Sequence, residues 1–131
     1  MIVDTSALIA ILNNEPDADR YIEALGSAET ASCSAGTYLE AAIVIDGQAN
    51  PVLGVRFDEL IADGKIEITP VAREHAYIAR HAYRDFGKGS GHPARLNFGD
   101  CFAYALARTS REPLLFKGDD FSHTDVASAL D

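Results

Sequence analysis

Apolar and polar residues follow one another along the chain in blocks that predict strands and helices in turn. Residues 1–3 form a short apolar run, typical of a buried strand, which ends at Asp4. Thr5 or Ser6 suits the N-cap of a helix that continues to about Leu12. The same patterns predict further helices over 16–25, 35–46, 51–63, 72–86 and 97–109, and further strands over 29–34, 66–69 and 114–116.

This alternation of strands and helices indicates an α/β domain with a mainly parallel sheet. In such sheets ligands bind at the carboxyl ends of the strands, so the residues just after each strand are the first candidates for a site. A length of 131 residues fits one domain over 1–131. Because no apolar run is long enough to span a bilayer and no signal peptide is apparent, a cytoplasmic protein without membrane contact is expected.

The charge balance is unusual for a protein that binds nucleic acid. Eleven Lys and Arg face 20 Asp and Glu, for a net charge of −9, whereas affinity for phosphates normally comes from Lys and Arg. Bound divalent cations would offset part of this charge, and a basic segment of a partner protein would also suit it. The two cysteines, Cys33 and Cys101, form no metal or redox motif and are expected to be small buried residues.

A few acids stand among apolar residues instead of on polar helix faces. Asp4 ends the first strand, Glu40 and Asp100 share helical faces with apolar neighbours, and Asp119 and Asp120 follow the last strand. Taken singly, each has an ordinary explanation as a cap, a turn residue or a half-exposed helix residue. Together they indicate a cluster of carboxylates at one edge of the sheet.

An ionised carboxylate on an apolar face needs a basic partner, a proton or a metal ion. Basic residues are scarce, and none lies within a helical turn of Glu40. A divalent cation resolves the conflict, and hard oxygen ligands select Mg²⁺, with Mn²⁺ as the alternative.

Four segments of the chain also resemble the motifs of one known family. Residues 1–7 (MIVDTSA), 38–40 (YLE), 96–107 (LNFGDCFAYALA) and 114–121 (LLFKGDDF) are similar, in order and spacing, to the motifs of PIN-domain toxins of the VapC type. The third of these segments contributes Asp100. The resemblance extends over essentially the whole chain.

The resemblance implies a PIN fold, with a central, mainly parallel sheet of about five strands flanked by helices on both faces. It implies a Mg²⁺-dependent endoribonuclease that acts on structured RNA such as tRNA or rRNA. It also implies neutralisation by a VapB-type antitoxin, and a homodimer.

The resemblance to the family also implies a role for each candidate residue. Asp4 and Asp100 are expected to bind the first metal ion, and Glu40 to bind it through water or to act as general base. Asp119, which lies nearer the strand end, is favoured as the fourth acid over Asp120. Ser6 matches a hydroxyl of the family motif and is expected to orient Asp4 or to cap the first helix.

Binding of RNA still requires positive charge near the acids. Lys88 and Arg95, in the glycine-rich segment before the helix at 97–109, and Lys117, beside the late acids, are the candidates for contacts to phosphates. The plain alternative is a solvated loop with scattered charges. The aromatic residues of the last two predicted helices are expected in the core or in a dimer interface.

Two other classes of function remain open at this point. A receiver-like signalling module of the response-regulator type also combines clustered acids with a late lysine, here Lys117, although no paired acids precede the first helix. A catalytically inactive interaction module is the other alternative, because the fourth acid is ambiguous.

Overall fold

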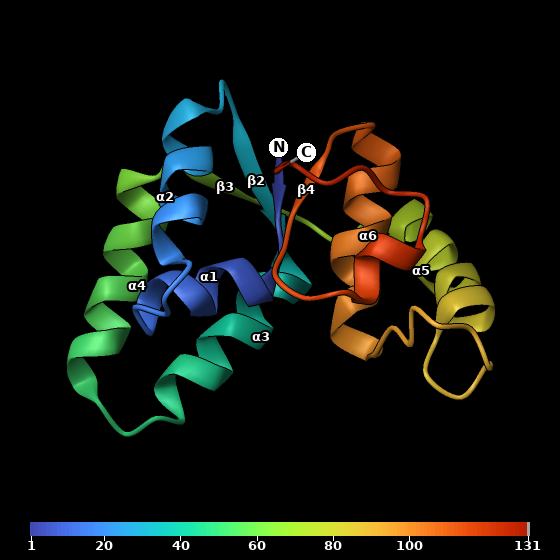
Figure 1. Cartoon of the computed structure of the whole chain (residues 1–131), viewed down its shortest axis with the longest axis horizontal. Helices are drawn as coiled ribbons and strands as arrows, with labels where there is room; N and C mark the ends of the chain where they lie inside the picture. Colours follow the sequence, from blue (N-terminus) through green and yellow to red (C-terminus); the bar gives the residue numbers. More distant parts are fainter. Residues whose placement is uncertain (131) are drawn as a thin grey trace.

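A computed structural model describes residues 1–130, which form four strands, six α-helices and one short 3₁₀ helix (Figure 1). The elements in chain order are β1 (Ile2–Val3), α1 (Thr5–Leu12), α2 (Ala18–Ser27), β2 (Ala31–Ser34), α3 (Ala35–Asp46), α4 (Pro51–Asp63), β3 (Ile66–Thr69), α5 (Arg73–Phe86), α6 (Phe98–Ser110), β4 (Leu114–Leu115) and η1 (Asp120–His123). The predicted alternation of strands and helices is confirmed.

The sheet is parallel throughout, with strand order β3-β2-β1-β4. Its four strands are one fewer than the expected number of about five. The segment after η1 does approach the free edge of β4, where the Leu114 N–H donates to the Ala127 carbonyl at 2.8 Å and the Ala129 N–H donates to the Leu114 carbonyl at 2.9 Å. This contact is a single bridge, between Leu114 and Ser128, and it does not extend into a strand.

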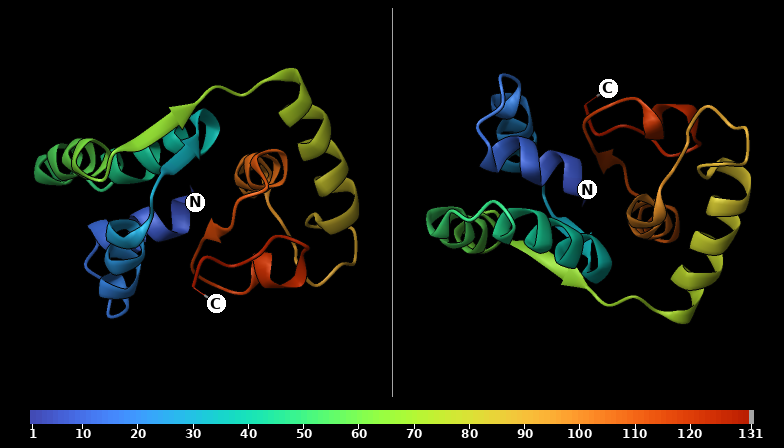
Figure 2. Two further views of the ribbon diagram at one scale, coloured as in Figure 1. Left: turned by 90° about the horizontal axis from the view of Figure 1, so that it is seen from above. Right: turned by 90° about the horizontal axis from the view of Figure 1, so that it is seen from below.

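Successive residues of the neighbouring strands β1 and β4 supply the cores on opposite faces of the sheet. Val3 and Leu115 pack with α1 to α4 on one face, whereas Ile2 and Leu114 pack with α5 and α6 on the other. All four side chains are fully buried. Figure 2 shows the two groups of helices on either side of the strands, as the family resemblance implied.

Several element boundaries differ from those predicted. Helix α2 begins at Ala18 instead of Pro16 and runs through Gly26 to Ser27, so Gly26 does not end it as predicted. Helix α6 continues to Ser110, and Arg111 ends it in the left-handed conformation. Cys33 and Cys101 are buried and unpaired, as expected. No helix in residues 1–130 is long and apolar enough to cross a membrane.

The parallel strands bring three helix starts to one edge of the sheet. Asp4 follows β1 and its N–H donates to the Leu115 carbonyl at 2.9 Å, so the ends of β1 and β4 lie side by side. Ser34 ends β2 and caps α3 through the Gly36 N–H. Helix α6 packs against α3 and β1 and begins at the same end, so acids from distant segments converge there.

Candidate active site

Asp4 is the most deeply buried of the candidate acids, with 3% of its surface exposed. It is the N-cap of α1, and its Oδ2 accepts hydrogen bonds from the Ser6 N–H at 3.0 Å and the Ser6 hydroxyl at 2.6 Å. The Ser6 Oγ in turn accepts the Lys117 N–H at 2.9 Å. Ser6 therefore both caps the helix and fixes the Asp4 carboxylate to the chain that follows β4.

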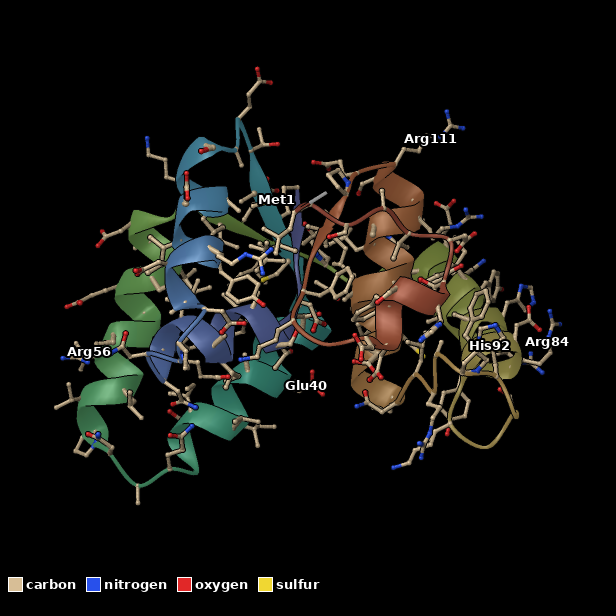
Figure 3. The ribbon with its side chains drawn as sticks, viewed as in Figure 1. Met1, Glu40, Arg56, Arg84, His92 and Arg111 are labelled. Atoms are coloured by element: carbon tan, nitrogen blue, oxygen red, sulfur yellow. The ribbon has the colours of Figure 1, made fainter. Side chains whose placement is uncertain are left out.

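Glu40 reaches the same edge from the second turn of α3 (Figure 3). The Thr5 hydroxyl donates to its Oε1 at 2.6 Å. Its carboxylate lies against Gly99 of α6 so closely that a Cβ at position 99 would come within 1.9 Å of Oε2. The Glu40 carboxylate can occupy this place only because residue 99 has no side chain.

Asp100 has a structural role as well as a place among the acids. Its Oδ2 accepts the Asn97 N–H at 2.9 Å, while the Asn97 side chain accepts the Asp100 N–H at 2.9 Å. This reciprocal capping box begins α6. Helix N-termini favour negative charge, so α1 and α6 partly offset the cost of holding Asp4 and Asp100 ionised.

The pKa of Asp4 and the pKa of Asp100 show that the acids act on one another. Burial raises the pKa of Asp4 to about 6; the Glu40 carboxylate adds to this effect and hydrogen bonds from Ser6 oppose it. Burial also raises the pKa of Asp100 to about 7, and the carboxylates of Asp4, Asp120 and Glu40 add to this effect. The hydrogen bond from the Asn97 N–H opposes it. The structure therefore gathers four acids from four segments.

Of the two late acids, Asp120 is the one whose charge raises the pKa of Asp100, whereas the sequence favours Asp119. Asp120 opens η1 and its charge acts on Asp100. Asp119 precedes η1 and lines a different cavity, of about 570 Å³, together with Arg20 and Lys117. The preference for Asp119 rested on closeness to the strand end, but the positive φ of Gly118 turns the chain there.

Among residues 1–130, none of the four acids pairs with Lys or Arg. Within residues 1–130, the hydrogen bonds from Ser6 and Asn97 to Asp4 and Asp100 end on Oδ2, and the one from Thr5 to Glu40 ends on Oε1. The second oxygen of each carboxylate accepts none of these bonds. Hard, partly desolvated oxygens of this kind fit a divalent cation. As the side chains of the described residues stand, no three His, Cys, Asp or Glu are arranged to hold a metal ion.

The three basic candidates differ in their surroundings. Lys117 is not free, because its Nζ donates to Glu15 at 2.5 Å and to Asp17 at 3.0 Å; these carboxylates raise the pKa of Lys117. Lys88 and Arg95 are exposed. They flank a closed loop in which the Lys88 N–H donates to the Leu96 carbonyl at 2.8 Å.

Sequence reasoning missed two residues that shape this site. Thr5 was considered only as a cap, yet its hydroxyl holds Glu40 across 35 positions. Gly99 received no role, although it admits the Glu40 carboxylate. Gly99 could have been found because it lies in the first turn of a predicted helix. A glycine there lowers helix propensity, which indicates that the position needs a residue without a side chain.

Comparison with known proteins agrees with this geometry. A family model of the PIN domain matches residues 1–127. Ribonuclease VapC28 of Mycobacterium tuberculosis is 56% identical over 131 residues, which cover 100% of this chain and 98% of that protein. Ribonuclease VapC42 of the same organism is 46% identical over 129 residues, covering 98% of each.

Solved structures show the same fold at low identity. The crystal structure of the Mycobacterium tuberculosis toxin VapC20, described as cleaving the sarcin–ricin loop, has a TM-score of 0.76 at 16% identity over 96% of this chain and 95% of that one. A toxin–antitoxin complex from Klebsiella pneumoniae has a TM-score of 0.70 at 16% identity, over 92% and 89%. The chain belongs to the PIN-domain family, and within it to the VapC ribonucleases.

The raised pKa values predict that the metal-free protein loses stability as the pH rises. Folded Asp4 and Asp100 have a pKa of about 6 and about 7, against 3.8 for an unperturbed aspartate. The folded state therefore binds more protons between pH 4 and 7, and its stability falls over that range. In EDTA at pH 8, Asp100→Asn should raise the free energy of unfolding by about 1–2 kcal/mol, a value discounted for partial exposure.

The measurement is urea unfolding at pH 4, 6 and 8, with Asp58→Asn, an exposed position on α4, as the matched control. The gain from Asp100→Asn should shrink towards pH 4, and the control should show no pH-dependent gain. A uniform loss of stability at every pH would contradict the mutual repulsion of these acids.

Proposed function

We propose that this chain is a single PIN domain that acts in the cytoplasm as an RNA-cleaving toxin, hydrolysing phosphodiester bonds of tRNA or rRNA. The observation that carries the proposal is the convergence of Asp4, Glu40, Asp100 and Asp120 without a basic partner among residues 1–130. It is supported by full-length similarity to proteins named VapC ribonucleases.

In the proposed site, Asp4, Asp100 and Asp120 hold Mg²⁺, with Mn²⁺ as the alternative, through the oxygens that lack protein donors. A bound divalent cation supplies an activated water and charge neutralisation on the phosphate. Because no three acids among the described residues stand in a ligating arrangement, binding requires side chains to rotate towards one another. Asp119 is kept as a second choice for the fourth acid.

The residues around these acids have separate tasks in the proposal. Glu40, whose charge acts on Asp100, accepts the proton of the attacking water or binds the cation through water. Ser6 and Thr5 are positioning residues, because each donates a hydrogen bond that holds a carboxylate of the site. Lys117 would contact phosphate only after leaving Glu15 and Asp17.

The proposal includes two protein partners. A VapB-type antitoxin is supported by the toxin–antitoxin complex among similar structures and by a net charge of −9, which favours a basic segment. A homodimer is supported by the exposed side chains of Leu39, Ile43 and Val44 on α3, an apolar face that a second copy would cover.

The first test is cleavage of purified tRNA and rRNA. The unchanged protein should cleave in Mg²⁺ or Mn²⁺ and become inactive in excess EDTA, and Asp4→Asn should reduce cleavage to background because the cation has one ligand fewer. The melting temperature of Asp4→Asn should be unchanged or raised, since repulsion with Glu40 falls.

Growth arrest on expression, relieved by co-expression of a VapB-type antitoxin and abolished in Asp4→Asn, is the test in cells. Full activity of Asp4→Asn, or activity in excess EDTA, would refute the proposed site. Light scattering on the same preparation gives the mass of the assembly and decides between monomer and homodimer.

Gly99→Ala tests the close approach of α6 to Glu40. The added Cβ would lie within 1.9 Å of Oε2 and must displace the carboxylate. Displacement of a group by about 1 Å is expected to lower cleavage about 10- to 100-fold. The melting temperature should change little, because the displaced atoms end a flexible side chain and alanine favours the helix.

Gly54→Ala on α4 is the matched control, since its nearest neighbour, Asp46 Oδ1, would be at an ordinary 3.5 Å. It should leave cleavage unaltered. If Gly99→Ala cleaves as fast as the unchanged protein, the position of Glu40 against α6 is not needed.

Charge reversal at Lys88 and Arg95 tests the basic loop. Both are exposed, and Lys88→Glu with Arg95→Glu should weaken RNA binding and reduce the slope of log K against log salt by about one for each phosphate that is no longer neutralised. Arg56→Glu on α4, which lies at the opposite end of the molecule in Figure 3, is the control. An unchanged slope would exclude this loop.

A further inference from the structure

Phe98, the first residue of α6, has 76% of its surface exposed. The sequence placed the aromatic residues of this region in the core or in a dimer interface, and Phe98 is not in the core. Its ring is held in place, because it packs edge-to-face on Phe102 at a centroid distance of 5.1 Å and an angle of 86°. Phe102 is itself wedged against Gly36 of α3.

A cavity of about 250 Å³ lies beside this ring, between α5 and α6. Phe98 and Phe102 line it from α6, and Arg80 and Tyr83 from α5. Pockets for small-molecule ligands usually measure roughly 300–1,000 Å³. The cavity is therefore small for a whole nucleotide, while its aromatic walls suit one flat ring.

The charge around the cavity is opposite to that of the rest of the protein. Residues 73–95 hold five of the 11 Lys and Arg and only two of the 20 acids. Three of the four histidines lie in the same range. An aromatic surface within a basic region is the combination that binds single-stranded nucleic acid.

The position of Phe98 connects this surface with the acids. Residues 98 and 100 occupy one helical turn about 200° apart, so the Phe98 ring and the Asp100 carboxylate leave opposite sides of the same helix end. Gly99, between them, contacts the Glu40 carboxylate. A strand that crosses the start of α6 therefore meets both the acids and the ring.

We propose that Phe98, supported by Phe102 and flanked by Tyr83 and Arg80, is a stacking site for one unpaired nucleobase of the RNA. This inference rests on the proposed function and adds the requirement that the RNA near the cleaved bond be unpaired. The competing occupant is a second copy of this chain. In a two-fold contact the same surface meets itself, which would bring the Lys and Arg of residues 73–95 against their own copies.

The experiment compares two RNA probes in an inactive Asp4→Asn background. One is a fluorescein-labelled 12-residue oligouridylate, and the other has the same backbone with abasic riboses. Fluorescence anisotropy in Mg²⁺ gives the dissociation constant of each probe with Asp4→Asn alone, with added Phe98→Leu, and with added Tyr77→Leu. Tyr77 is the matched control, because it is 61% exposed on α5 but does not line the cavity.

Stacking predicts that Asp4→Asn binds the oligouridylate about 5-fold or more tightly than the abasic probe. Phe98→Leu should remove most of this preference by weakening only the base-containing probe, whereas Tyr77→Leu should keep it. A loss of affinity for the base-containing probe alone indicates stacking between the ring and a base. A general loss of structure would weaken binding of both probes alike and would overturn the proposal.

Light scattering on the same variants tests the competing occupant. A change from dimer to monomer in Phe98→Leu, with the preference for bases retained, would assign the ring to the interface between copies and overturn the stacking site. Cleavage by the unchanged protein separates the two proposals: if it cleaves RNA while Phe98→Leu keeps the preference for bases, only the stacking site fails. If it neither binds nor cleaves RNA, the proposed function fails.

Discussion

The architecture of this protein depends on holding like charges together at one edge of a parallel sheet. Asp4 is buried at the end of β1, and the Ser6 hydroxyl connects its carboxylate to the backbone of Lys117 after β4. That connection joins residues 111 positions apart in the chain. Strands β1 and β4 cannot shift relative to each other without moving the Asp4 carboxylate. The strand register of the sheet therefore determines the geometry of the site.

Helix starts make this concentration of negative charge tolerable. Asp4 caps α1 and Asp100 takes part in the capping box of α6, so each acid stabilises the helix that presents it. The cost that remains appears as the raised pKa of both groups. Without a cation, repulsion and burial of these acids lower the free energy of unfolding at neutral pH. Burial of the two hydrophobic cores must offset this loss.

The sequence was sufficient to predict the fold class and to single out Asp4, Glu40 and Asp100, because these acids interrupt apolar patterns of the strands and helices. It was not sufficient for contacts between distant segments. The choice between Asp119 and Asp120 depends on the turn at Gly118, and the pairing of Lys117 with Glu15 crosses 102 positions. Helical periodicity carries no information on either.

The separation of charge along the molecule has a consequence for encounter with a polyanion. Residues 73–95, which include α5, hold five Lys and Arg and two acids, for a net charge of +3. The rest of the chain holds six Lys and Arg and 18 acids, for a net charge of −12. Charge separated in this way gives a molecule an electric dipole, and a dipole exerts a torque on an approaching nucleic acid before any contact forms. The positive end therefore arrives first, and the strand is delivered to the acids from that side instead of being turned away by them.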